Sequence, residues 1–343
     1  MTEPFNHRLA QAARILLGRP ASRPVAREIP ALTDEEIAEA RQFFPLEKFF
    51  IFGHARAGTT VFVRLIRLHP EVHCSYQAHF FTRPPLLESL VADREVAAWL
   101  KRDSNRWNRG RDLSPVILRA AADMILEREA RRENKRIVGD KSPNNLLDGQ
   151  AVQLVHKIYP DARLIYILRD GRDTILSHRI QAFVEFPERL SQEDQRIRRD
   201  FSRDPEPFRR GERSLFSEEG IQRAAEGWVR NVTQTHLLGT NLYCERYLVS
   251  RYEDLLAQPW QELTRLWDFL KASPPPGELE QAVDAEMHRN PDAEWQQQKA
   301  REIAAPVQRG RQGSWREMFT TRDRRLFLQV AGDTLTDWGY ETS

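Results

Sequence analysis

The stretch that decides the fold is FFIFGHARAGTT, residues 49–60. An apolar run of the kind found in buried parallel strands leads into a glycine-containing loop, and Thr59 and Thr60 then open an amphipathic helix. The pattern matches the phosphate-binding loop G-x-x-x-x-G-K-[ST] except at the lysine, where Thr59 stands. Glycines let backbone N–H groups close around an anion, and the helix N-terminus adds its positive dipole. The stretch therefore predicts a strand, loop and helix that together bind an anion.

Arg56 lies inside this loop and supplies a cation in another place. Its planar guanidinium can hold two oxygens of a phosphate or sulfate at once. Ala57, Gly58, Thr59 and Thr60 add backbone donors and two hydroxyl groups. A Mg-ATP enzyme normally also has a loop lysine and a strand-end carboxylate for the metal, and we cannot place both here. The loop favours an anion that is held without a metal.

The same change from strand to helix recurs three times along the chain, at residues 136–160, 163–180 and 246–258. Alternating strands and helices predict an α/β fold with one central parallel sheet flanked by helices. Ligands of such sheets bind at the carboxyl ends of the strands. The loop at 53–60 makes this a P-loop-like arrangement.

Two helices are expected before the sheet, one near residues 8–17 and one near 34–44, the second with a capping box from Thr33 and Glu36. Residues 1–45 are therefore predicted to be an N-terminal helical cover, and 46–343 the main domain. A stretch at about 185–219 is crowded with charged residues and proline. We interpret it as a mobile lid inserted in that domain.

The composition sets outer bounds on function. With 40% hydrophobic and 30% charged residues the chain is typical of soluble globular proteins, and a net charge of +2 does not indicate a nucleic-acid partner. Cys74 and Cys244 are the two cysteines, without metal-type spacing, which favours the reducing cytoplasm and neither a disulfide framework nor a metal site. The N-terminal apolar stretch is too short for a signal peptide or membrane span.

A second candidate for anion binding follows the strand at 163–168. Arg169 stands at the end of that strand, and Ser177 comes eight positions later in the first turns of the next helix. A guanidinium and a hydroxyl in these places can flank a further phosphate at the carboxyl end of the strand.

Together the stretches GHARAGTT (53–60) and YILRDGRDTILSHR (166–179) resemble the paired signatures of the sulfotransferase family. Members of this family take sulfate from 3'-phosphoadenosine 5'-phosphosulfate (PAPS). The resemblance implies that the loop from Arg56 to Thr60 holds the 5'-phosphosulfate. It also implies that Arg169 and Ser177 hold the 3'-phosphate.

Two later segments extend the resemblance. QRGRQGSWREMFT (308–320) is similar to the third family signature R-K-G-x-x-G-D-W, although Gln308 and Ser314 depart from it. This implies a 3'-phosphate contact from Arg309 and the backbone of Gly310. SRYEDLLAQP (250–259) resembles a segment in which a tyrosine lies by the adenine, which nominates Tyr252.

The loop resembles the bacterial, carbohydrate-type and tyrosyl-protein members more than the cytosolic ones. Many cytosolic members, which act on small phenols and steroids, carry lysine and tryptophan at the positions of Arg56 and Val61. The segment LHPEVHCSYQAHFF (68–81), with a histidine-proline pair, agrees with the first group.

Sulfuryl transfer also needs charge stabilisation and a proton acceptor. Lys141, at the end of the strand RIVGDK, is the candidate cation for the leaving oxygen, and related enzymes have a lysine in a comparable place. Relatives often carry a glutamate base near Gln77, but an amide cannot accept the proton. His79, which we expect on the same side of an extended segment as Gln77, is the first candidate base, and Asp140 is the second.

The resemblance implies a PAPS-dependent enzyme that sulfates a hydroxyl or amine and needs no metal. Two alternatives remain open: a P-loop-type kinase, and a nucleotide-binding protein without turnover, which Gln77 suggests. The acceptor could be a glycan, a lipid, a peptide or a small metabolite, because acceptor specificity lies in variable segments. The sequence leaves the oligomeric state open.

Overall fold

The structure is a computed structural model that describes residues 28–82, 87–102, 104, 106–143, 148–289 and 312–342. Its strands are β1 (Glu47–Gly53), β2 (Val72–Tyr76), β3 (Ile137–Lys141), β4 (Arg163–Leu168) and β5 (Tyr247–Arg251). Its α-helices are α2 (Asp34–Phe43), α3 (Thr59–Ile66), α4 (Ser89–Ala92), α5 (Arg94–Leu100), α6 (Ser114–Arg132), α7 (Gln150–Ile158), α8 (Gly171–Glu185), α9 (Gln192–Arg203), α10 (Glu206–Arg209), α11 (Glu218–Tyr243), α12 (Tyr252–Ala257), α13 (Pro259–Phe269), α14 (Leu279–His288), α16 (Trp315–Met318) and α17 (Thr321–Asp337). Two short 3-10 helices are η1 (Pro187–Arg189) and η2 (Cys244–Arg246).

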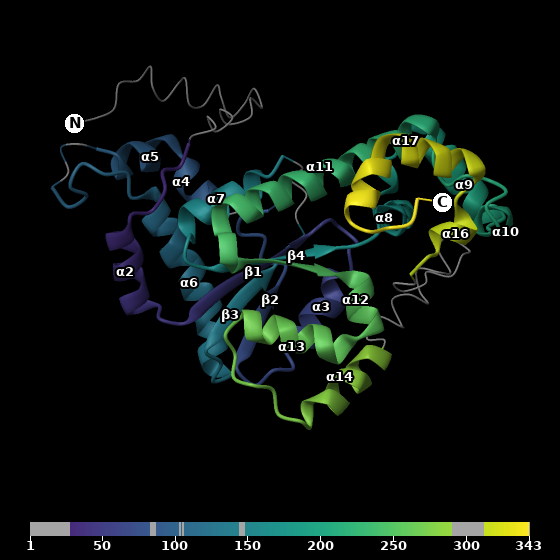
Figure 1. Ribbon diagram of the computed structural model, residues 1–343. Helices are drawn as coiled ribbons and strands as arrows, with labels where there is room; N and C mark the ends of the chain where they lie inside the picture. The colour runs from purple at the N-terminus through teal and green to yellow at the C-terminus, as the bar shows by residue number, and fades with distance from the viewer. Residues whose placement is uncertain are drawn as a thin grey trace, which may run out of the picture.

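The five strands form one parallel sheet in the order β2-β3-β1-β4-β5, as expected for alternating strands and helices (Figure 1). The chain leaves β1 toward β2 and β3 on one side and leaves β4 toward β5 on the other. The order therefore reverses between β1 and β4. In open parallel sheets this reversal opens a crevice at the carboxyl ends of the strands, where ligands bind.

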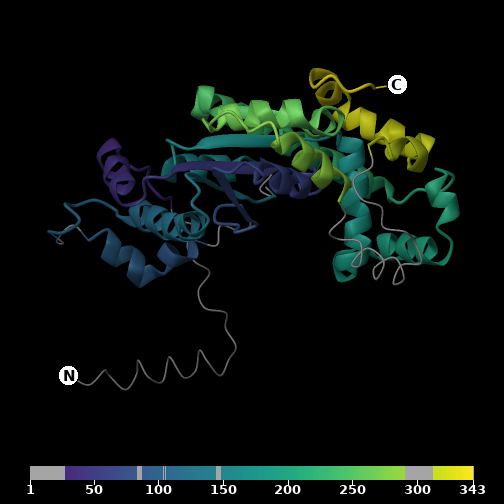
Figure 2. The same cartoon turned by 90° about the horizontal axis from the view of Figure 1, so that it is seen from below.

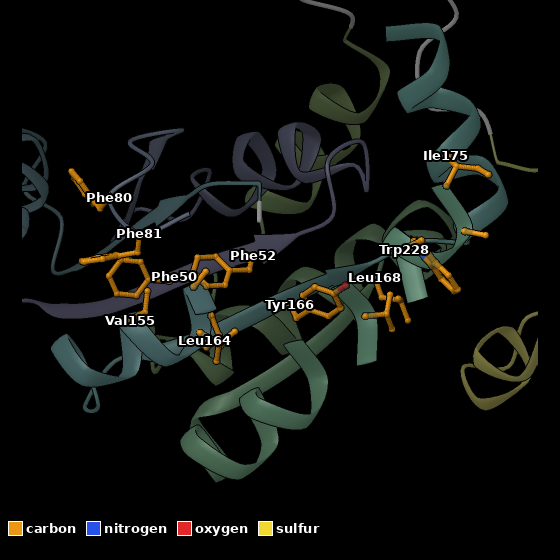
Figure 3. Packing of buried hydrophobic residues seen from close by; sticks show 14 of the residues in the cluster. Phe50, Phe52, Phe80, Phe81, Val155, Leu164, Tyr166, Leu168, Ile175 and Trp228 are labelled. Carbon is orange, nitrogen blue, oxygen red and sulfur yellow. The ribbon is translucent and has the colours of Figure 1, made fainter. Parts of the chain in front are cut away.

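Helices cover both faces of the sheet, which lies between them when the molecule is turned (Figure 2). Successive residues of a strand point to opposite faces. Phe50 and Phe52 accordingly enter the apolar cluster under α6, α7, α8 and α11, whereas Phe49 and Ile51 enter the cluster under α3, α13 and α14. Figure 3 shows the first cluster, with Tyr166 of β4 among its members. The continuous apolar run of β1 is thus buried on both sides.

Helix α2 confirms the predicted second N-terminal helix. The side chain of Thr33 accepts a hydrogen bond from the backbone of Glu36, whose carboxylate accepts one from the backbone of Thr33. This is the capping box that the sequence indicates. The helix predicted at residues 8–17 lies outside the described residues. The division into a cover at 1–45 and a main domain stays a prediction.

The charged stretch at 185–219 contains the helices α9 and α10 together with the start of α11. Four of its apolar side chains are buried in the larger cluster: Phe201, Phe208, Leu215 and Phe216. The stretch is poor in apolar residues, but these side chains bury enough surface for it to pack. It lies beside α8, α16 and α17 at one end of the molecule (Figures 1 and 2). A lid motion of this segment stays a prediction.

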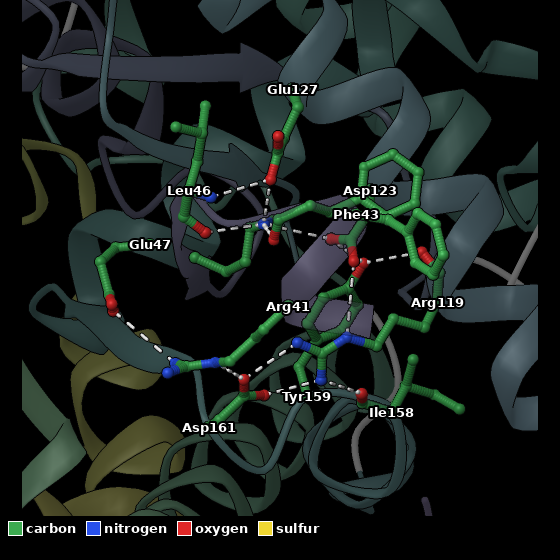
Figure 4. Close-up of polar contacts among 12 residues, drawn as sticks. Arg41, Phe43, Leu46, Glu47, Arg119, Asp123, Glu127, Ile158, Tyr159 and Asp161 are labelled. Atoms are coloured by element: carbon green, nitrogen blue, oxygen red, sulfur yellow. Dashed lines mark hydrogen bonds and ion pairs between the residues drawn. The ribbon is translucent and has the colours of Figure 1, made fainter. Parts of the chain in front are cut away.

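A buried ionic network joins β1 to α6 at the amino end of the sheet (Figure 4). The ammonium of Lys48 lies 2.7 Å from Glu127 and 3.5 Å from Asp123. Arg119 lies 3.4 Å from the carboxylate of Asp123 and 2.8 Å from that of Asp161. Buried charges are tolerated when they are paired in this way, and removing one partner costs about 3–5 kcal/mol. The network therefore belongs to the scaffold and lies away from the carboxyl ends of the strands.

Candidate functional site

The loop after β1 has the backbone that its glycine predicts. Gly58 caps α3 with φ +88°, a left-handed conformation that favours glycine. A Cβ atom at Gly58 would lie 2.2 Å from Cδ2 of Tyr252, so the tyrosine ring packs directly against the loop. Arg169 also lies against this ring, with its Cζ 4.9 Å from the centroid. Tyr252 is 5% exposed as a result. An adenine contact of Tyr252 stays a prediction.

The two predicted anion sites meet at the carboxyl ends of β1 and β4. Nη1 of Arg169 donates a hydrogen bond of 2.9 Å to the carbonyl of Arg56, and Nε of Arg56 donates one of 3.1 Å to Oγ of Ser177. The end of β4 and the first turns of α8 are thereby joined to the loop after β1. The structure thus brings together three residues that the sequence assigned to opposite ends of one nucleotide.

Lys141, the last residue of β3, lies near Arg56 at the same site. Its side chain is 0% exposed, and its Nζ has no hydrogen-bond partner among the described residues. Burial lowers the pKa of Lys141 to about 8, Asp140 and Cys74 act in the opposite direction, and the nearby charge of Arg56 lowers the pKa further. A buried ammonium without a hydrogen-bond acceptor fits an anionic group bound beside it.

The segment after β2 differs from the extended chain that we expected. Gln77 and His79 have φ values of +55° and +52°, which are not those of an extended chain. The prediction that these two side chains share one side of an extended segment is therefore wrong. Nδ1 of His79 lies 2.9 Å from Oγ1 of Thr82, and the backbone N–H of His79 donates to Oγ of Ser142 at 2.9 Å. His79 is thus placed next to the loop after β3, and its role as a base stays a prediction.

Asp140 is 2% exposed, and both of its carboxylate oxygens accept hydrogen bonds. The donors are the backbone N–H of Ala78 at 3.0 Å and the hydroxyl of Ser142 at 2.6 Å. Burial raises its pKa to about 6. Because Asp140 precedes Lys141 in a strand, the two side chains leave on opposite faces of the sheet. Asp140 therefore leaves β3 on the face opposite Lys141, and its role as a base stays a prediction.

The C-terminal segment returns to the site through Asp173 of α8. One oxygen of this buried carboxylate accepts from the backbone N–H of Gly313 at 2.7 Å, and the other accepts from that of Trp315 at 3.1 Å. Burial raises the pKa of Asp173, while Arg169 and the two backbone donors act in the opposite direction. Arg309 and Gly310 lie outside the described residues. Asp173 nevertheless ties the end of their segment to α8.

The chain also matches a known protein family. The model of the family described as "Sulfotransferase family" matches residues 48–276, which is more than half of the 343 residues. The chain belongs to the sulfotransferase family. The match begins in β1 and extends past α13, so it includes the loop at 53–60, Lys141 and Arg169.

Known relatives share part of this sulfotransferase-family chain. It is 27% identical over 158 residues to protein-tyrosine sulfotransferase 2 of Gallus gallus, a match that covers 45% of this chain and 39% of the relative. It is 30% identical over 131 residues to protein-tyrosine sulfotransferase of Drosophila melanogaster, covering 37% of this chain and 24% of the relative. The matches therefore span well under half the length of these two relatives.

One solved structure with a similar fold is mouse sulfotransferase SULT7A1 complexed with PAP. It is 15% identical to the chain with a TM-score of 0.46, and the match covers 89% of this chain and 90% of that one.

Two further observations bear on this member of the sulfotransferase family. Among the helices of the described residues, none has both the length and the apolar character needed to cross a membrane. Within the same residues, no three histidine, cysteine, aspartate or glutamate side chains are grouped so that they could hold a metal ion.

Two residues of the site escaped the sequence analysis of this sulfotransferase-family chain. Tyr76 ends β2 beside Lys141, and Asp173 holds the C-terminal segment. The signal for Asp173 is its place four residues after Arg169, in the first turn of α8. Tyr76 ends β2, but its partners Thr60 and Lys141 come from other elements and leave no pattern in the nearby sequence.

The contacts of Asp173 lead to a prediction for this sulfotransferase-family site. Asp173→Asn should weaken binding of adenosine 3',5'-bisphosphate about 5- to 20-fold. The amide oxygen can accept a hydrogen bond from one of the two backbone N–H groups, but the amide NH₂ would then face the other N–H, and two donors cannot bond. Calorimetric titration would measure the loss. Asp337→Asn, an exposed aspartate at the end of α17, is the matched control and should bind as the unmodified protein does. Equal binding by the two variants would contradict the role of Asp173.

Proposed function

We propose that this protein transfers a sulfuryl group from PAPS to an acceptor hydroxyl or amine and releases adenosine 3',5'-bisphosphate. The observation that carries the proposal is the meeting of Arg56, Lys141 and Arg169 around the loop at 53–60 in a member of the sulfotransferase family. The nucleotide is the co-substrate, and it carries the group that is transferred.

Each end of the donor has residues that fit it. Arg56, with the backbone from Ala57 to Thr60, would hold the phosphosulfate, since a helix N-terminus and a guanidinium both bind anions. Arg169 and Ser177 would hold the 3'-phosphate. Arg309 and Gly310 would add to that contact, and Tyr252 would lie by the adenine.

The chemistry would depend on Lys141 and on a proton acceptor. The ammonium of Lys141 would hold its proton at Nζ beside the bridging oxygen, where negative charge grows in the transition state. His79 remains the first candidate base and Asp140 the second. Fixed cations beside the donor would take the part that a metal plays in kinases.

Acceptor, assembly and compartment are less closely specified. We propose glycans, lipids and small metabolites as acceptor classes, together with tyrosyl peptides, which the names of the two relatives indicate. We also propose a cytoplasmic location, which the free thiols of Cys74 and Cys244 support.

A binding protein without turnover is the second candidate. It is favoured by the engagement of both candidate bases: Nδ1 of His79 lies against the hydroxyl of Thr82, and both oxygens of Asp140 accept hydrogen bonds. Such a protein would keep the nucleotide site and lack the proton transfer.

One experiment separates these functions. The full-length protein is incubated with ³⁵S-labelled PAPS and fractions of a cell extract, with and without EDTA, and Lys141→Met serves as the matched control. We expect label to enter an acceptor fraction, equally with and without chelator, and much less with the variant. Thermal stabilisation by adenosine bisphosphate without labelled product would support the binding protein. Chelator-sensitive phosphate transfer from ATP would support a kinase.

A further inference from the structure

Tyr76, the last residue of β2, contacts two groups of the donor site that come from other elements. Its hydroxyl lies 3.0 Å from Oγ1 of Thr60 in the first turn of α3. Nζ of Lys141 lies over its ring, 3.7 Å from the centroid. Tyr76 and Lys141 are paired in the parallel register of β2 and β3, so their side chains leave on the same face. The strand register therefore fixes this contact.

The ring has a particular importance for Lys141. The ammonium is fully buried and has no hydrogen-bond partner among the residues that the structure describes. The face of Tyr76 is a favourable contact for its charge, in addition to the nearby Asp140 and Cys74. A cation over an aromatic face is stabilised more strongly when water is excluded. Tyr76 itself is 51% exposed, so it also forms part of the surface that an acceptor would meet.

We propose that Tyr76 is a positioning residue, whose ring holds the ammonium of Lys141 and whose hydroxyl fixes the side chain of Thr60. It would act through these two groups and set the distance between the loop after β1 and the end of β3. Its effect on turnover rests on the proposed sulfuryl transfer, whereas its effect on Lys141 exists in the protein without donor or acceptor.

Two substitutions separate the roles of the ring and the hydroxyl. Tyr76→Phe keeps the ring over Lys141 and removes the hydrogen bond to Thr60. Tyr76→Leu keeps apolar bulk but removes both contacts. The other charged or titratable groups that act on Lys141 are Asp140, Cys74 and Arg56, and both variants keep them.

The first measurement is an NMR titration of Lys141 in the full-length protein without ligand. Carbon-13-labelled lysine supplies the signal, and Lys141→Met assigns it. We expect Tyr76→Phe to keep the midpoint of the unmodified protein. Tyr76→Leu should lower it by about half to one and a half pH units, because the buried ammonium loses the aromatic face. Phe43→Leu, at an exposed ring on α2, is the control and should change nothing.

The second measurement is turnover with the acceptor that the labelling experiment identifies. We expect kcat to fall about 3- to 10-fold in Tyr76→Phe and about 10- to 100-fold in Tyr76→Leu. Adenosine bisphosphate binding should change less than about threefold, since the 3'-phosphate residues are untouched. An unchanged or higher Lys141 midpoint in Tyr76→Leu would overturn the proposal whatever the activity. If Tyr76→Leu lowers the Lys141 midpoint but the unmodified protein transfers no sulfate, the contact between Tyr76 and Lys141 is supported and the proposed function is rejected.

Discussion

Lys141→Met is expected to lower kcat for sulfate transfer about 100- to 1000-fold, the usual loss when one fixed stabiliser of transition-state charge is removed. Methionine fills a similar volume without a charge. Binding of PAPS in the absence of acceptor should change less than about threefold, because the bridging oxygen that Lys141 would face carries less charge in the bound donor than in the transition state. Steady-state kinetics and calorimetric titration measure the two quantities. A loss in binding as large as the loss in kcat would contradict this role.

The same variant should be more stable than the unmodified protein. Burial lowers the pKa of Lys141 from 10.5 to about 8, so the unfolded chain binds more protons between these values and the contribution of this group to the unfolding free energy rises with pH in that window. At neutral pH the buried ammonium therefore costs stability. Lys141→Met should raise the free energy of unfolding by up to about 3 kcal/mol, measured by denaturant titration. Lower stability would indicate that Lys141 is a structural cation.

The pH profile gives an independent check on Lys141. The ammonium is present below its pKa of about 8, so kcat/KM, which reports the free enzyme, should fall as pH rises through that value. The fall should be about tenfold per pH unit. Lys141→Arg, which keeps its proton, should remove this fall up to about pH 10, whatever its absolute rate.

Arg169→Ala is expected to weaken adenosine 3',5'-bisphosphate binding at least about 100-fold, while His79→Ala weakens it less than about threefold. Two effects add in Arg169→Ala. The variant loses the charge-assisted contact that we propose with the 3'-phosphate. It also loses the hydrogen bond to the carbonyl of Arg56 and the contact with the ring of Tyr252. Calorimetric titration of both variants measures the difference.

Two controls accompany the Arg169 experiment. Arg169→Lys should recover only a part of the affinity, because an ammonium lacks the planar fork that holds two oxygens. Thermal unfolding without ligand shows whether Arg169→Ala is still folded, since the buried side chain of Arg169 also donates a hydrogen bond to the carbonyl of Arg56. Similar losses in Arg169→Ala and His79→Ala would mean that the two roles are assigned wrongly.

The repeating units of the fold could be predicted from the sequence because their signals are local. The apolar run of β1, the capping box of Thr33 and the glycine at position 58 each depend on residues a few positions apart. Parallel strands then place the loop after β1 and the end of β4 at one edge of the sheet. This is why Arg56, Arg169 and Ser177 were predicted together.

Other features were not predictable because they depend on contacts between distant segments. The left-handed backbone at Gln77 and His79 breaks an alternation that an extended chain would show. The buried phenylalanines of 185–219 pack against residues from other parts of the chain, and the composition of the segment does not reveal these partners. The hydrogen bonds of Asp173 reach residues about 140 positions away, so its place four residues after Arg169 does not reveal which groups it binds.

By itself the sequence determined the strands, the helices and the loop that suits an anion, because backbone conformation and the spacing of apolar residues are properties of short segments. The tertiary structure alone decided which charges meet there: the register of β2 and β3 sets Tyr76 over Lys141, and the order of the strands brings Arg169 to the carbonyl of Arg56. The physical reason is that an ammonium or guanidinium takes its chemistry from the groups that surround it in space, and most of those groups lie far away along the chain.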